Sequence, residues 1–251
     1  LIISCLLVLS ITSAIFGWFQ YMFWPDLTSL KYLGWDDHLL RMVGSFLDPT
    51  YLGLVLLLGI IASYEKYPKI TYFLLVSLAF TYSRSSYLIA GLFLVFKKKY
   101  FALAVFIVTI LLLPKMIGEG TNLARTASGT NKLVNFNETL QIIKKSPVFG
   151  VGFNNLCSAK NLYLGERNTD SHSCGGSDSS VLFLVATTGV VGFILFLNLI
   201  LKVPVNHILI PSFVAVLIHS LFANSLFYPH IMFWLFALVG LGSEVDRKSS
   251  S

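Results

Sequence analysis

The 251-residue chain is 55% hydrophobic and only 12% charged, with a formal net charge of +6 and a mean hydropathy of +0.76. Soluble domains carry about 25% charged residues, so this chain has too little charge to cover the surface of a soluble fold. The composition therefore excludes an ordinary soluble domain and predicts an all-α integral membrane protein.

Eight apolar segments are predicted to be transmembrane helices, because about 20 apolar residues are needed to cross roughly 30 Å of hydrocarbon. They are residues 1–24, 49–64, 70–82, 86–96, 100–117, 181–201, 208–223 and 231–242. Several are short, so we expect tilting, local thinning of the bilayer or burial among neighbouring helices. The sequence has no internal repeat and no linker, which indicates a single transmembrane domain over residues 1–251.

Basic residues predict the orientation. They follow the second, fourth, sixth and last segments, as Lys66 and Lys69, Lys97 to Lys99, Lys202, and Arg247 with Lys248. Eight crossings place all of them on one side, which the positive-inside rule makes cytoplasmic. Both termini are then cytoplasmic, and the loops 25–48 and 118–180 are extracytoplasmic.

Arg41 precedes the second segment, and the Asp48-Pro49 step between them predicts a capped helix start. This places Arg41 in a structured outer loop close to the bilayer. Two interpretations are open: Arg41 binds a ligand, or it pairs with an acidic neighbour. The acidic neighbours are Asp36, Asp37 and Asp48.

Arg84 lies between two short apolar runs, within the sequence Ser83-Arg84-Ser85-Ser86. An arginine at the centre of a span costs roughly 2.5–3.5 kcal/mol on insertion scales, so it is usually shielded and functional. Either Arg84 extends to lipid phosphates from a helix turn, or it binds an anionic substrate. His219, within the seventh segment, is expected to form a hydrogen bond between helices.

The long loop 118–180 has an internal order. After Arg125, residues 135–145 have the apolar pattern of a short amphipathic helix lying on the membrane. Pro147 to Gly152 then predict a tight turn, because proline and glycine favour turns. The loop also contains two cysteines, Cys157 and Cys174, which either pair in an oxidising compartment or remain free thiols.

Other motifs are missing from the sequence or point to packing. Neither a phosphate-binding loop nor a dinucleotide fingerprint is present, and no cluster has the spacing of metal ligands. We therefore expect no metal, no cofactor and no nucleic-acid partner.

Gly189 and Gly192 form a small face suited to close helix packing. The apolar segments contain no carboxylate, which argues against a proton- or cation-coupled carrier.

Several of these stretches, taken in chain order, resemble the O-antigen ligase and O-antigen polymerase superfamily of bacterial membrane glycosyltransferases. The matching pieces are Arg41 to Gly53, Thr81 to Ser86, Pro147 to Gly152, His172, Thr188 to Gly192, and Trp234 to Gly240. The resemblance runs from about residue 40 onward. Members usually have more spans, and the chain begins at Leu1, so we expect further helices to precede it.

The resemblance implies a GT-C-like fold and a metal-independent transfer at the outer face of the bacterial cytoplasmic membrane. The expected donor is a polyprenyl-diphosphate-linked glycan held in membrane lipid, and the acceptor is a glycan, a lipid or a protein. The expected catalytic residues are His172 as general base, with Arg41 and Arg125. The expected substrate-binding residues are Arg84, Asp178, Gly150, Gly152 and Asn154.

The chain departs from the family's pattern at two places. Ser173 follows the loop histidine where members commonly have asparagine. Thr187-Thr188 stand where members commonly have a glutamate, and Asp178 is the candidate to replace that carboxylate.

A second function remains open, a flippase for lipid-linked oligosaccharides or another transporter whose path the arginines line. A flippase needs neither a general base nor a long ordered loop. A non-catalytic scaffold would not explain Arg84.

Overall fold

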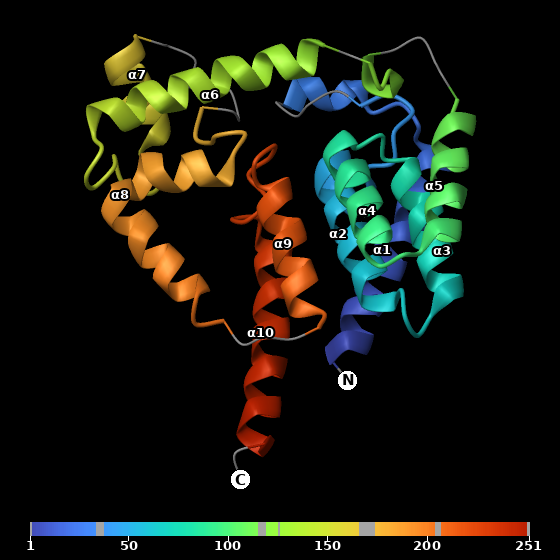
Figure 1. Cartoon of the computed structure of the whole chain (residues 1–251). Coiled ribbons are helices and arrows are strands. Elements are labelled where there is room, and N and C mark those ends of the chain that lie inside the picture. Colours follow the sequence, from blue (N-terminus) through green and yellow to red (C-terminus); the bar gives the residue numbers. More distant parts are fainter. Residues whose placement is uncertain are drawn as a thin grey trace. The chain divides into compact units, whose positions relative to one another are not determined.

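The computed structural model describes residues 2–33, 38–114, 119–124, 126–165, 174–203 and 207–249. Within these ranges the regular structure is helical, with an isolated β-bridge between Asp26 and Leu39 (Figure 1). The all-α prediction is confirmed for this part of the chain. The chain divides into two compact units, one of residues 1–125, 205–219 and 233–251, the other of residues 126–204 and 220–232.

The first unit contains most of the apolar helices. They are α1 (Ile2–Phe23), α2 (Pro49–Ser63), α3 (Pro68–Ala79), α4 (Arg84–Phe96), α5 (Tyr100–Leu112), α9 (Leu209–His219) and most of α10 (Pro229–Ser249). The described part of this unit also has three short 3-10 helices: η1 (Thr28–Leu33) and η2 (Gly44–Phe46) between α1 and α2, and η3 (Glu119–Thr121) after α5. The second unit contains α6 (Ala127–Lys145), α7 (Leu156–Leu164), α8 (Ser180–Ile200) and the first residues of α10.

Each predicted apolar segment coincides with a helix, although most of these helices are short. Among the described residues, α1 and α8 are long and apolar enough to cross a membrane, and six other apolar stretches of helix have 10–17 residues, with α10 counted from Pro229 to Gly240. α5 ends at Leu112, short of the predicted residue 117, because Pro114 forces Leu113 out of the helical region (ψ 139°). The number of crossings stays a prediction.

The start of α2 follows the sequence prediction. The Asp48 side chain accepts hydrogen bonds from the amides of Thr50 and Tyr51, and Pro49 occupies the first turn. Proline suits this position because the first amides of a helix have no partner within it. The capped start at Asp48-Pro49 is confirmed, and it fixes where the loop that carries Arg41 joins the helix.

Small residues let the helices of the first unit approach closely. A Cβ on Gly59 of α2 would lie 2.5 Å from the Ser10 side chain of α1, and Ser10 Oγ donates to the carbonyl of Val55 at 3.1 Å. Such residues are typical of helix packing in membranes, where van der Waals contact replaces the hydrophobic effect. α2 is the most buried helix of this unit, from Leu52 to Ile61.

α8 is broken at Gly189, whose backbone (φ 67°, ψ −171°) is not helical. Figure 1 shows the two halves meeting at an angle. The predicted span 181–201 therefore consists of two helical halves joined at Gly189. The prediction of close helix packing at Gly189 is wrong, because its neighbour is a turn: an added Cβ would lie 2.1 Å from the carbonyl oxygen of Val148.

Candidate active site

Arg41 is buried in the first unit, with 7% of its surface exposed. Its Nε donates to the carbonyl of Thr81 at 3.2 Å and its Nη2 to the carbonyl of Tyr82 at 3.4 Å. Gly120 of η3 packs against the same side chain, since a Cβ there would lie 3.0 Å from Arg41 Cδ. The guanidinium thus holds the turn between α3 and α4.

Gln20 of α1 fixes the backbone beside Arg41. Its Oε1 accepts from the amides of Val43 (3.0 Å) and Gly44 (3.4 Å), and its Nε2 donates to the carbonyls of Trp24 (2.9 Å) and Arg41 (3.5 Å). The side chain is 5% exposed. Gln20 was not predicted as a site residue, although an amide side chain within an apolar run is a signal visible in the sequence.

Arg84 is the first residue of α4 and is exposed. Its Nη1 donates to the carbonyl of Leu123 at 3.5 Å. Arg41 and Arg84 therefore share one turn: the buried arginine holds the carbonyls of residues 81 and 82, and the exposed arginine follows at 84. Arg125 comes two residues after Leu123 but lies outside the described residues.

His219 ties α9 to the first turn of α4. Its Nε2 lies 3.0 Å from Ser85 Oγ and 3.3 Å from Ser86 Oγ, and Ser86 Oγ lies 2.9 Å from Ser83 Oγ. The histidine is fully buried. The predicted hydrogen bond between helices is confirmed, and it fixes the helix end that carries Arg84.

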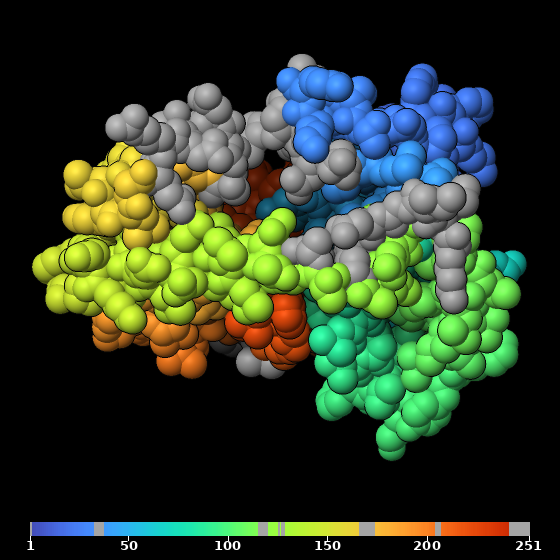
Figure 2. Space-filling model, turned by 90° about the horizontal axis from the view of Figure 1, so that it is seen from above, coloured from blue at the N-terminus to red at the C-terminus, as the bar shows by residue number. Residues whose placement is uncertain are grey.

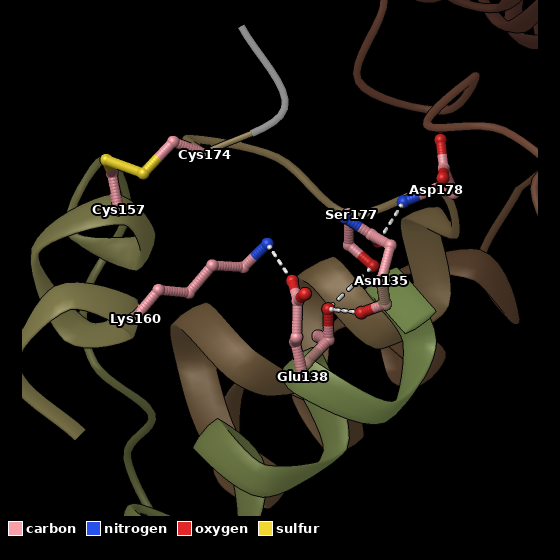
Figure 3. Close-up of polar contacts among 8 residues, drawn as sticks. Asn135, Glu138, Cys157, Lys160, Cys174, Ser177 and Asp178 are labelled. Atoms are coloured by element: carbon pink, nitrogen blue, oxygen red, sulfur yellow. Dashed lines mark hydrogen bonds and ion pairs between the residues drawn. A yellow bond between two sulfur atoms is a disulfide. The ribbon is translucent and has the colours of Figure 1, made fainter. Parts of the chain in front are cut away.

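A second group of polar side chains lies on one face of α6. Asn135, Glu138 and Thr139 have the spacing of neighbours on one side of a helix. Glu138 Oε2 lies 3.1 Å from Nζ of Lys160 on α7, a lysine only 2% exposed (Figure 3). A buried charge is stable only when paired. Neither member of this pair was predicted, because the two residues are 22 positions apart in sequence.

The segment before α8 is attached to the same face of α6. The amide of Asp178 donates to Asn135 Oδ1 at 2.9 Å, and the hydroxyls of Ser177 and Thr139 are hydrogen-bonded at 3.1 Å. Figure 3 shows the Asp178 carboxylate pointing away from Asn135.

A disulfide joins α7 to the other end of that segment. Cys157 and Cys174 are bonded, with their Cα atoms 4.7 Å apart. The bond decides between the two alternatives that the sequence left open, paired cysteines or free thiols. His172 precedes Cys174 by two residues but lies outside the described residues.

α6 is longer than the predicted amphipathic helix and packs differently. It begins at Ala127, ahead of the predicted residue 135. Ile142 is fully buried in a core with Leu156 and Phe183, and Ile143 packs against that core. Ile142 and Ile143 therefore pack on the protein core, which corrects the prediction for these two side chains. Leu140 is 44% exposed, and the contact of α6 with the membrane stays a prediction. Figure 2 shows the outer face of α6 (yellow-green) open to view along its length, with α7 (yellow) beside it.

The turn after α6 is confirmed, and it fills the break in α8. Gly150 and Gly152 have positive φ angles (68° and 92°). A Cβ on Gly150 would lie 2.4 Å from the carbonyl carbon of Thr187, so only glycine permits this approach. Four backbone hydrogen bonds join the two segments: Val151 N to Ala186 O (2.9 Å), Gly152 N to Thr187 O (2.8 Å), Val190 N to Pro147 O (2.9 Å) and Val191 N to Val148 O (3.2 Å).

The predicted substrate-binding residues of this unit lie beside two different parts of α8. The amides of Gly150 and Gly152 already donate to Ser146 and Thr187, while Asn154 is exposed. Asp178 precedes the helix by two residues, and the helix start at Ser180 lies about 10 Å along its axis from the turn's contact at Thr187. The structure does not bring Asp178 together with the glycines, and binding by any of these residues stays a prediction.

Thr187 and Thr188, where the resemblance led us to expect a glutamate, bond to their own helix. Thr187 Oγ1 contacts the carbonyls of Phe183 (2.8 Å) and Leu184 (3.3 Å), and Thr188 Oγ1 that of Leu184 (2.8 Å). Within the described ranges, no three His, Cys, Asp or Glu side chains are grouped as metal ligands.

A comparison with known families identifies the chain. The family model described as O-antigen ligase matches residues 70–197, just over half of the chain. The match covers Arg84, the turn at 147–152 and the start of α8. No curated protein and no solved structure matches the chain. The protein belongs to the O-antigen ligase family of membrane-embedded enzymes, which transfer lipid-linked glycans to acceptors.

Proposed function

We propose that this protein transfers a polyprenyl-diphosphate-linked glycan to an acceptor hydroxyl at the outer face of the bacterial cytoplasmic membrane. The observation that carries the proposal is the arrangement of two arginines on one turn. Arg84 is exposed at the start of α4, and Arg41 is buried beneath the preceding carbonyls. An accessible guanidinium can bind the charged diphosphate of the donor. Its place at the start of an apolar helix suits a donor whose polyprenyl tail stays in the bilayer.

The reaction requires a base and a stabilised leaving group. The acceptor oxygen attacks the anomeric carbon as its proton passes to His172, a side chain that titrates near neutral pH. The bond from the anomeric carbon to the diphosphate oxygen breaks, and the diphosphate keeps the electron pair. Arginine matches phosphate oxygens two at a time, so Arg84 and Arg125 stabilise the departing charge, and Arg41 positions the turn while adding its own charge.

The disulfide supports the proposed orientation. Cysteines are kept reduced in the cytosol and pair in extracytoplasmic compartments. The bond between Cys157 and Cys174 therefore favours an extracytoplasmic side for the loop 118–180, which contains His172. With eight crossings, both termini are then cytoplasmic.

Purified protein with a lipid-linked donor and an acceptor tests the function. His172→Ala is expected to lower the rate by roughly 10²- to 10⁴-fold, whereas His207→Ala, at an exposed histidine, retains it. Arg84→Lys is expected to lose most activity because lysine keeps the charge but not the two-point geometry.

A wild-type rate in His172→Ala would place the base elsewhere. A wild-type protein that moves the donor between leaflets of a proteoliposome, yet forms no glycosidic bond, would be a flippase and would overturn the proposal.

A further inference from the structure

Three apolar side chains of the turn after α6 are exposed. Val148 is 52% exposed, Phe149 74% and Phe153 59%. The Phe153 ring packs on Phe183 and Phe227, with ring centroids 5.4 and 6.2 Å apart. The turn is therefore a fixed element with an apolar tip.

The surface of α8 changes character at the same place. Before Gly189 its side chains pack into the core of the second unit, as at Phe183 and Ala186. After the break most of its apolar side chains are exposed: Val190 49%, Val191 40%, Ile194 58%, Leu195 64%, Leu197 42% and Leu199 64%. α8 also has the length and composition of a membrane-crossing helix. The second half thus has the surface expected of a helix in lipid.

Backbone hydrogen bonds place the turn at the level where this exposed surface begins. Val190 and Val191 donate to the carbonyls of Pro147 and Val148. In lipid a broken helix is tolerated only when other groups satisfy its freed amides and carbonyls, and the turn supplies these partners. The apolar tip of the turn and the exposed face of α8 are therefore continuous.

We propose that the turn 147–153 inserts into bilayer lipid, with Val148, Phe149 and Phe153 contacting acyl chains as an extension of the lipid-facing surface of α8. Lys144 and Lys145, exposed at the end of α6, lie just before the turn, where they reach lipid phosphates. The proposal rests on the membrane placement of α8 and does not depend on the transfer reaction.

Fluorescence quenching tests this placement. Phe149→Trp, reconstituted into vesicles of brominated phosphatidylcholine, is compared with the same variant in unbrominated vesicles. The emission of the four native tryptophans is subtracted by using wild-type protein. The expected result is blue-shifted emission that falls in brominated lipid by a larger fraction than the wild-type signal. Val148→Trp provides a second site with the same expectation.

Ser158→Trp is the matched control, because Ser158 is exposed on α7 of the same unit. Its added emission is expected to be red-shifted and unquenched. Red-shifted, unquenched emission from Phe149→Trp would place the turn in water. Blue-shifted but unquenched emission would show that protein covers it, and equal quenching of both variants would show no preferred lipid contact. Each of these results would overturn the proposal.

Discussion

Lys160 and Glu138 form an ion pair, with Nζ and Oε2 3.1 Å apart, the lysine 2% exposed and the glutamate 20%. Removing one member of a fully buried pair leaves a charge in the protein interior without a counter-ion, which costs about 3–5 kcal/mol. Glu138→Gln is expected to lower the free energy of unfolding by up to that amount, measured in detergent solution. The double variant Glu138→Leu with Lys160→Met should recover most of the loss. Wild-type stability in Glu138→Gln would contradict the buried pair.

Gly189 is expected to be intolerant of a side chain. Its Cβ would meet the carbonyl oxygen of Val148 at 2.1 Å, and its φ is +67°. Gly165 is the matched control, because its φ is +69° and nothing lies within 4 Å of its added Cβ. Gly165→Ala should lose about 1–2 kcal/mol of stability from the left-handed backbone alone. Gly189→Ala should lose clearly more, because the turn must separate from α8, and equal losses would mean that the turn is not docked there.

The disulfide is expected to stabilise the second unit. Cys157 and Cys174 are 17 residues apart in sequence, and closing a loop of this size contributes about 3 kcal/mol. Cys157→Ser should lower the unfolding temperature, while Cys5→Ser, at an exposed free cysteine, should not. The side of the membrane on which the loop lies is tested in intact cells. A membrane-impermeant reductant is added first, and the freed thiols are then labelled. Labelling only after lysis would contradict an extracytoplasmic loop.

His219 is expected to serve stability more than catalysis. His219→Ala removes its contacts with Ser85 and Ser86, each worth about 0.6 kcal/mol on average within a membrane, and leaves a cavity. The unfolding temperature should fall, while the transfer rate per folded molecule stays near that of the wild type. Unchanged stability together with a lost rate would instead give His219 a part in the reaction.

The sequence by itself determined where the apolar helices lie, because local signals are sufficient for that. Runs of apolar residues gave each such helix, and Asp48 with Pro49 gave the start of α2. The tight turn at Pro147 to Gly152 was equally local, since proline and glycine restrict the backbone wherever they occur. In the candidate site, Arg41 and Arg84 stood out for the same reason: a charge beside or within an apolar run is visible without knowledge of the fold.

Only the tertiary structure decided which of these residues meet. Nothing in the sequence indicated that Arg41 binds the carbonyls just before Arg84. Every residue has a backbone carbonyl, so the residue types give no sign of which carbonyl an arginine will bind. Glu138 and Lys160 were not predicted to interact, because they are 22 residues apart in sequence and meet only where α6 packs against α7. Gly189 was predicted to pack against another helix. The break in α8 could not be predicted, because the groups that form hydrogen bonds on both sides of it come from a turn about 40 residues earlier in the chain. Residues that meet in this way are far apart in sequence and have no regular spacing. The packing of the helices therefore decides which of them come into contact.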